Sequence, residues 1–218
     1  MAVNWDTLWA ALGETVYMTV PSTLIAYALG LPLGVMLVIT RKGGVRPMPT
    51  FNAVTGAIVN FLRSIPFIIL LAMLFPVTRV VMGKAIGTRS VIFPLTVSAF
   101  PYVARMVEGS FNEVDSGIIE AAQSMGSTTF QIIRKVLIPE ALPSLINGFA
   151  ICMTTILAYT AMASAAGGGG LGALAITKGL NLRQYDIMYA ASIVLVILVQ
   201  IITMLGSYLT RKMDHRIR

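Results

Sequence analysis

The carboxylates are the side chains with the widest chemical repertoire here, and five of the nine lie in the middle of the sequence: Glu108, Glu113, Asp115, Glu120 and Glu140. Acid–base or nucleophilic catalysis would need partners for them. The single histidine, His215, lies in a basic tail, and the single cysteine, Cys152, lies inside an apolar run. No catalytic triad or metal cluster can be assembled from these residue types. We therefore expect no enzymatic activity and no metal.

A second chemical candidate is the glycine run that begins at Gly167. Residues 167–172 read GGGGLG, which fits the G-x-G-x-x-G spacing of dinucleotide sites. No strand pattern precedes it, and it lacks the Gly-Lys-Ser/Thr ending of a phosphate-binding loop. We interpret it as an irregular turn in which backbones approach closely, and we expect no cofactor.

Composition explains why so little chemistry is present. Hydrophobic residues make up 56% of the chain and charged residues 11%, and the mean hydropathy is +0.82. A chain of 218 residues cannot bury that much apolar surface in a soluble core. The net charge of +7 does not indicate nucleic acid, because the basic residues stand at the ends of apolar runs. The fold class predicted is an all-α polytopic protein of the lipid bilayer.

Five transmembrane helices are expected within a single domain, residues 1–218. Trp5 and Trp9 precede the first span, and they suit a helix at the membrane interface. Gly30 and Gly34, inside that span, predict close helix packing. The spans are predicted at Thr15–Ile39, within Thr50–Val80, at Ser90–Val107, at Leu142–Met162 and at Ile187–Leu209.

Basic residues set the expected orientation, with the N-terminus outside and the C-terminus in the cytoplasm. Five Lys or Arg residues fall in the predicted outer segments: Arg79, Lys84, Arg89, Lys178 and Arg183. The other eleven fall inside: Arg41, Lys42, Arg46, Arg63, Arg105, Arg134, Lys135, Arg211, Lys212, Arg216 and Arg218. Arg105 and Glu108 are spaced to form an ion pair on one helix.

The second span contains Arg63, Ser64 and Pro66 within one turn. A charge at membrane depth faces protein, water or a headgroup. We expect Arg63 to reach the cytoplasmic interface, and the alternative is a polar surface inside the protein. Pro66 should bend this helix, because it removes a backbone donor.

The segment at about 113–139 is the most strongly amphipathic part of the chain. Asp115 or Ser116 is expected to cap a first helix, and Gly126 to end it in the left-handed conformation. Thr128 with Gln131 predicts a capping box on a second helix, which Pro139 should end. The predicted apolar face comprises Ile118, Ala122, Met125, Phe130, Ile133, Val136 and Leu137. The opposite face, including Glu120, would be offered to a soluble partner.

These residues also carry a resemblance. Glu120-Ala121-Ala122, three residues, Gly126, nine residues and Val136-Leu137-Ile138-Pro139 resembles the EAA loop of bacterial ABC importer permeases, E-A-A-x3-G-x9-I-x-L-P. Residues 63–71, RSIPFIILL, are similar to a segment of methionine ABC permeases.

The resemblance implies a type I permease fold in the cell inner membrane. It implies a second permease copy, two cytoplasmic ABC ATPase subunits that bind the ATP, and an extracytoplasmic methionine-binding protein. The EAA residues Glu120, Ala121, Ala122, Gly126 and Pro139 would couple the permease to the ATPase, and Arg63, Ser64 and Pro66 would form the family motif of the second span.

Tyr159, Met162 and Ser164, just before the glycine run, are our candidates for the wall of the substrate path. Met162 suits a gate, and it equally suits ordinary core packing. Two alternatives to methionine import remain: a permease for another amino acid or small nutrient, and a stand-alone secondary carrier. The carrier reading is disfavoured, because no carboxylate is predicted at mid-membrane.

Overall fold

The computed structural model describes residues 5–214, and this part of the chain is helical throughout, without strands. Its α-helices are α1 (Trp5–Thr40), α2 (Pro49–Ser64), α3 (Phe67–Met73), α4 (Phe75–Met82), α5 (Thr88–Asn112), α6 (Ser116–Ser124), α7 (Thr129–Ile132), α8 (Ile138–Met162), α9 (Leu171–Leu174) and α10 (Tyr185–Met213). Three tighter or wider helical segments join them: the π-helix η1 (Ile133–Leu137), the 3-10 helix η2 (Ala163–Ala166) and the π-helix η3 (Ala175–Asn181).

Four helices are long and apolar enough to cross a membrane, and a bent pair, α2 with α3, makes a fifth candidate. The predicted number of spans is therefore matched. The first helix is longer than expected, since α1 begins at Trp5 and is continuous to Thr40. Trp5 and Trp9 thus extend the first spanning helix rather than forming a separate interfacial one, and both side chains are exposed.

The second span is broken where a bend was predicted. Its two helices meet at 98°, and Ile65 and Pro66 between them have extended backbones. A proline disfavours the helical conformation of the residue before it, so Ile65 ends α2 and Pro66 precedes a new helix. The sequence signal located the break, but it underestimated the size of the turn.

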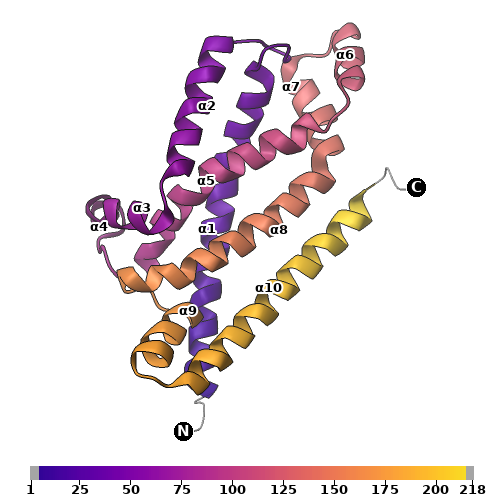
Figure 1. Cartoon of the computed structure of the whole chain (residues 1–218). Helices are drawn as coiled ribbons and strands as arrows, with labels where there is room; N and C mark the ends of the chain where they lie inside the picture. The colour runs from indigo at the N-terminus through magenta and orange to yellow at the C-terminus, as the bar shows by residue number, and fades with distance from the viewer. Residues whose placement is uncertain (1–4, 215–218) are drawn as a thin grey trace.

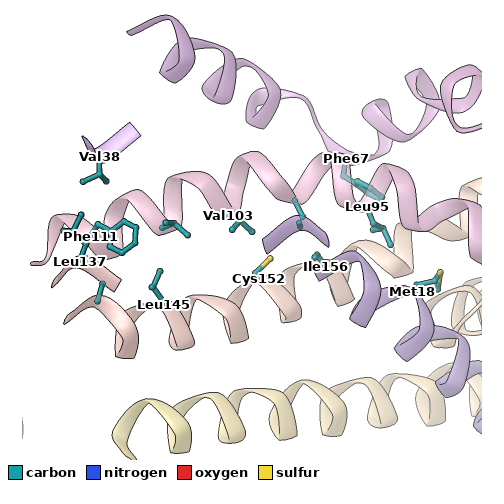
Figure 2. Packing of buried hydrophobic residues seen from close by; sticks show 14 of the residues in the cluster. Met18, Val38, Phe67, Leu95, Val103, Phe111, Leu137, Leu145, Cys152 and Ile156 are labelled. Atoms are coloured by element: carbon teal, nitrogen blue, oxygen red, sulfur yellow. The ribbon is translucent and has the colours of Figure 1, made fainter. Parts of the chain in front are cut away.

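The core lies between α1, α5 and α8 (Figure 2). Leu95, Val103, Cys152 and Ile156 are completely buried there. Gly30 and Gly34 of α1 let the backbones approach closely, because a Cβ on either would lie within 2.7 Å of α5 atoms. This confirms the predicted close packing, and it also places the free cysteine as a packing residue.

The helix ends gather at two opposite ends of the molecule (Figure 1). One end holds α6 and α7 beside the C-terminal end of α1 and the N-terminal end of α2. The Arg41 guanidinium donates to the Asn112 amide oxygen there, joining the ends of α1 and α5. The other end holds the N-terminal half of α1, the glycine run and α9. We refer to these as the coupling end and the glycine end.

Candidate functional site: the coupling segment and an aromatic cluster

The coupling segment, residues 113–139, begins with the local structure that its sequence predicts. The Asp115 side chain accepts a hydrogen bond from the Gly117 N–H at 2.7 Å and caps α6. Gly126 follows α6 with φ +76°. The Gly126 N–H donates to Gln123 O and the Ser127 N–H to Ala122 O, which is the Schellman pattern of a helix ended by glycine.

The second helix of the segment starts with the predicted capping box. The Thr128 N–H donates to Gln131 Oε1 at 2.8 Å, and the Gln131 N–H donates to Thr128 Oγ1 at 3.3 Å. Two otherwise unpaired donors are thereby satisfied. The hinge between α6 and α7 is consequently a defined turn with its own hydrogen bonds.

The predicted end of this second helix at Pro139 is wrong. The helix passes from α7 through η1 into α8, and Pro139 stands in the first turn of α8. The reason is the π-helical segment Ile133–Leu137, which directly precedes the proline. A wider turn relieves the clash between the proline ring and the preceding carbonyl, and it accommodates the missing N–H donor of the proline. The coupling segment is therefore continuous with a spanning helix.

Only some residues of the predicted apolar face of the segment are buried. Ala122, Ile132 and Leu137 are buried in the main core. Ile118, Met125 and Phe130 are exposed, the last two at 79% and 69%. The segment contacts the core through Ile119 and Ala122 and so is rotated from the predicted orientation. An apolar outer surface thus remains beside the exposed Glu120 and Ala121.

A shallow cleft separates α6 from the loop after α1. Arg41, Gly43 and Gly44 line one side, and Glu120 and Gln123 line the other. Glu120 is exposed and makes no ion pair with any of residues 5–214. The coupling segment therefore presents a carboxylate, a cleft and exposed apolar side chains at the coupling end.

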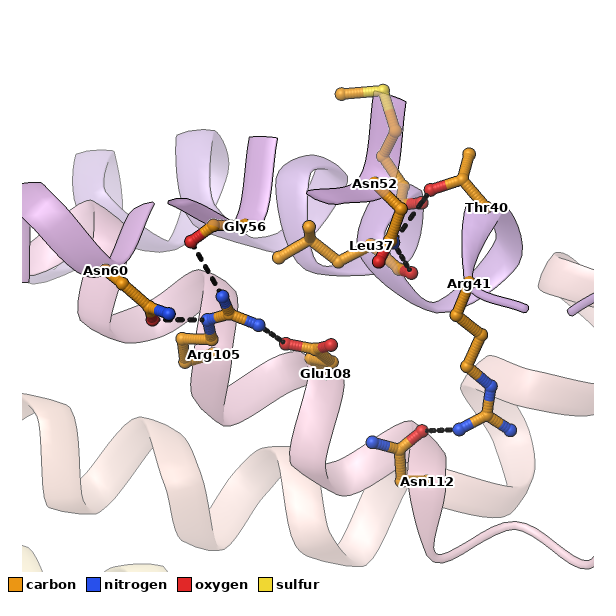
Figure 3. Close-up of polar contacts among 10 residues, drawn as sticks. Leu37, Thr40, Arg41, Asn52, Gly56, Asn60, Arg105, Glu108 and Asn112 are labelled. Carbon is orange, nitrogen blue, oxygen red and sulfur yellow. Dashed lines mark hydrogen bonds and ion pairs between the residues drawn. The ribbon is translucent and has the colours of Figure 1, made fainter. Parts of the chain in front are cut away.

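A polar seam runs between α2 and its neighbours α1 and α5 (Figure 3). The Asn52 amide donates to Leu37 O at 2.6 Å and to Thr40 Oγ1 at 3.0 Å. Arg105 donates to Gly56 O at 2.8 Å and to Asn60 Oδ1 at 3.1 Å. The predicted Arg105–Glu108 ion pair is present at 2.6 Å. These bonds fix α2 against the core.

Arg63 does not reach the coupling end. It lies in the last turn of α2, fourteen residues beyond Pro49, which corresponds to about 21 Å of helix. Its guanidinium carbon is 5.8 Å from the centre of the Tyr102 ring of α5. The expectation that Arg63 reaches the cytoplasmic interface stays a prediction, and the position of Arg63 fits the alternative of a polar surface inside the protein. Ser64 ends the same helix and donates to Asn60 O at 2.9 Å.

The structure brings two separately predicted groups of residues together. Phe67, in the α3 segment after Pro66, stacks on Tyr159 of α8 with ring centres 4.8 Å apart. Tyr102 lies near Arg63, Tyr159 and the Thr155 hydroxyl. We call Arg63, Phe67, Tyr102 and Tyr159 the aromatic cluster. Sequence reasoning missed Tyr102, and its aromatic ring one turn before Arg105 was the available signal.

The other two path candidates lie at the end of α8. Met162 is its last residue and is 48% exposed, so it is not a buried core residue of this chain. Ser164 follows in η2, where its hydroxyl donates to Ala161 O at 3.0 Å. Within residues 5–214, neither side chain is hydrogen-bonded to a charged group.

The glycine run forms the predicted irregular turn, and its backbone donors are paired with side chains of two helices. The Gly170 N–H donates to Glu14 Oε2 at 2.7 Å, and the Leu171 N–H donates to Thr15 Oγ1 at 2.9 Å. The Gly169 N–H donates to Thr88 Oγ1 at 3.2 Å. A run that could have cradled a phosphate is thus a junction between α1, α5 and α9. Within residues 5–214, no group of three His, Cys, Asp or Glu residues is placed to hold a metal.

Comparison with known proteins agrees with this geometry. A family model described as the inner membrane component of binding-protein-dependent transport systems matches residues 30–218. The chain is 46% identical to the probable D-methionine transport system permease protein MetI of Vibrio cholerae, over 99% of this chain and 96% of that protein. It is 41% identical to the methionine import system permease protein MetP of Bacillus subtilis, over 98% and 96% respectively.

A solved structure of the MetNI methionine ABC transporter, in an inward facing conformation, has a chain that is 42% identical. The TM-score is 0.96, and the match covers 99% of this chain and all of that one. The predicted type I permease fold is therefore confirmed. With the family model and full-length relatives in agreement, the chain belongs to the inner membrane components of binding-protein-dependent transport systems and is a permease subunit of an ABC importer.

Proposed function

We propose that this permease imports methionine, including D-methionine, through alternating access driven by a cytoplasmic ABC ATPase. The relatives at 41–46% identity that carry methionine in their names, matched over nearly their whole length, are the observation that carries the proposal. The RSIPFIILL segment of α2 and α3 supports the same substrate. The working complex would hold two permease copies, two ATPase subunits and an extracytoplasmic methionine-binding protein.

The coupling segment is the proposed contact with the ATPase. Its exposed Glu120, Met125 and Phe130 form a surface that fits a soluble partner, and its hinge at Gly126 has a fixed geometry. The small side chain of Ala121 would let the ATPase approach the exposed side of α6 closely, and that of Ala122 lets the core approach its buried side. Because α8 continues the segment without a break, movement of the ATPase surface would pass directly into a spanning helix. ATP would be bound by the partner, and this chain would need no cofactor.

The proposed orientation places the coupling end in the cytoplasm and the N-terminus outside. The substrate would pass Tyr159, Met162 and Ser164, between two copies related by a twofold axis. Met162, exposed at the end of α8, would seal this path.

Reconstitution tests the proposal. The permease, its ATPase and its binding protein are placed in vesicles, and labelled methionine uptake is measured with and without ATP. We expect ATP-dependent uptake in the wild type and its loss in Glu120→Arg and Gly126→Asp, with normal insertion. Asn181→Arg, an exposed position at the glycine end, is the control and should transport normally.

Each alternative gives its own result in this assay. Uptake that proceeds without any ATPase would favour the stand-alone carrier. ATP-dependent uptake that an excess of unlabelled methionine fails to compete would indicate another amino acid or nutrient.

A further inference from the structure

Arg63 lies on the side of α2 that faces the protein. The exposed apolar residues of α2 form one stripe, Phe51, Val54, Ile58 and Phe61. At 100° per residue, Arg63 lies opposite that stripe, on the same side as Gly56 and Val59, which are buried. The arginine is nevertheless exposed. An exposed charge on the inward side of a spanning helix indicates an aqueous surface rather than lipid.

The guanidinium of Arg63 has hydrogen-bonding capacity that the chain does not use. Arg105, one turn away along the seam, donates to Gly56, Asn60 and Glu108. Within residues 5–214, Arg63 has only the ring of Tyr102 beside it, with no carboxylate within ion-pair distance. A guanidinium offers five N–H donors in a fork that matches a carboxylate. Its donors are therefore available to a ligand.

The surroundings of Arg63 suit an amino acid that carries an apolar side chain. The Tyr102 ring beside Arg63 lies near Tyr159 and near the Thr155 hydroxyl. The Tyr159 ring in turn stacks on Phe67, which is buried. Aromatic faces and edges interact favourably with a thioether. One cation, three hydroxyls and two tyrosine rings thus lie near one another, contributed by α2, α5 and α8.

We propose that Arg63 binds the carboxylate of the amino acid in transit, while Tyr102 and Tyr159 contact its side chain and the buried Phe67 supports the Tyr159 ring. The chemical class of the ligand is an α-amino acid with an apolar side chain, and the identification of methionine rests on the function proposed above. Tyr159 thereby becomes part of a transient binding site rather than only a wall of the path.

Transport by Arg63→Gln tests the site in the reconstituted complex with its ATPase and loaded binding protein. We expect the amount of methionine delivered per ATP hydrolysed to fall at least about tenfold, since a hydrogen bond to a charged group is lost. ATP hydrolysis stimulated by the binding protein should persist. Arg63→Lys, which keeps the charge but not the fork, should give an intermediate value. A parallel loss of hydrolysis and uptake would assign Arg63 a structural role and overturn the proposal.

The lipid composition of the vesicles distinguishes the two anions that Arg63 could bind, the carboxylate of a substrate and the phosphate of a lipid. Vesicles are made of phosphatidylcholine alone or of phosphatidylcholine with phosphatidylglycerol. If Arg63 binds the substrate, the ratio of methionine uptake by Arg63→Gln to uptake by the wild type should be the same in both. A lipid phosphate at Arg63 predicts wild-type uptake that depends on the anionic lipid, with the variant insensitive to it, and this result would overturn the proposal.

The wild-type arm reports separately on the proposed function. If the complex imports another amino acid in place of methionine, the substrate assignment fails. The same ratio, measured with that amino acid, still decides the role of Arg63, because every α-amino acid carries the carboxylate.

Accessibility provides a second measurement that does not depend on transport. The native Cys152 is buried, so Arg63→Cys adds an exposed thiol to a low background. A charged thiol reagent should label it in the assembled complex, and saturating methionine should slow labelling several-fold. Labelling that is absent, or that methionine leaves unchanged, would show that the position faces lipid or lies off the path.

Discussion

Gly126 ends α6 with φ +76°, and a Cβ built at this position would have no neighbour within 4 Å. The requirement for glycine is therefore conformational and not steric. Gly126→Ala should lower the free energy of unfolding by about 1–2 kcal/mol, because L-residues are disfavoured in the left-handed region. Thermal unfolding of the purified permease measures this.

Gly126→Asn is the matched comparison for that measurement, since asparagine adopts the left-handed region more readily. It should unfold within a few degrees of the wild type. Equal losses in both variants would show that the side chain itself is not tolerated at this hinge.

Gly169 poses the opposite case, because its φ is ordinary and its space is filled. A Cβ there would lie 1.8 Å from Glu14 Oε2 and 3.0 Å from Thr88 Oγ1. Gly169→Ala should therefore destabilise the wild type, yet cost much less when Glu14 is already alanine. The double-mutant cycle in thermal stability should give a coupling of about 1 kcal/mol or more between the two positions. Additive losses would contradict the contact.

The hydrogen bonds of the coupling segment could be predicted residue by residue, because caps depend on a few adjacent side chains. Asp115, Thr128 and Gln131 carry their partners within three positions. The partners of Glu14 and Thr15 lie 156 positions away, and no local pattern identifies them. The neighbour of Arg63 could not be predicted for a related reason: it is Tyr102, in another helix.

At the scale of the helices, the seam between α2 and α5 depends on Arg105. Its partners Gly56 and Asn60 are on α2, whereas Glu108 is on its own helix. Arg105→Leu should destabilise the permease by about 3 kcal/mol or more, because it leaves Glu108 unpaired in a partly buried site. The change in the thermal midpoint of the purified protein measures this.

The double variant Arg105→Leu with Glu108→Leu is the control for the seam. It should recover part of the loss, since no unpaired charge remains. No recovery would indicate that the bonds to Gly56 and Asn60, rather than the ion pair, carry the stability.

Helix ends were harder to predict than helices. Pro139 and Pro66 have the same side chain, yet one stands in a continuous helix and the other at a 98° break. The difference lies in their neighbours: a π-helical turn precedes Pro139, and an extended Ile65 precedes Pro66. The rotation of α6 had a similar cause, because its contact with the core through Ile119 decides which face is buried.

For the whole molecule, the number of spans followed from hydropathy alone, since lipid permits little other than helices. The predicted orientation concerns the coupling end and the glycine end. Although Arg63 lies away from the coupling end, Arg41, Lys42, Arg134 and Lys135 are in the segments that form it. The positive-inside rule still favours a cytoplasmic coupling end.

Single cysteines in a Cys152→Ala background test this orientation. Ser124→Cys, at the exposed coupling segment, should react with an impermeant thiol reagent only from the cytoplasmic side. Asn181→Cys, exposed at the glycine end, should react only from outside. The reverse pattern would invert the topology and would separate the coupling segment from a cytoplasmic ATPase.

The unbroken helix from Thr129 to Ala166 has a mechanical consequence. Its 38 residues extend about 57 Å, from the hinge after Gly126 to the start of the glycine run. If it turns as a stiff lever about the core near its middle, a tilt of about 10° displaces each tip by about 5 Å in opposite directions. Cytoplasmic approach of two such levers would then become separation at their far tips, with Met162 carried on the moving arm.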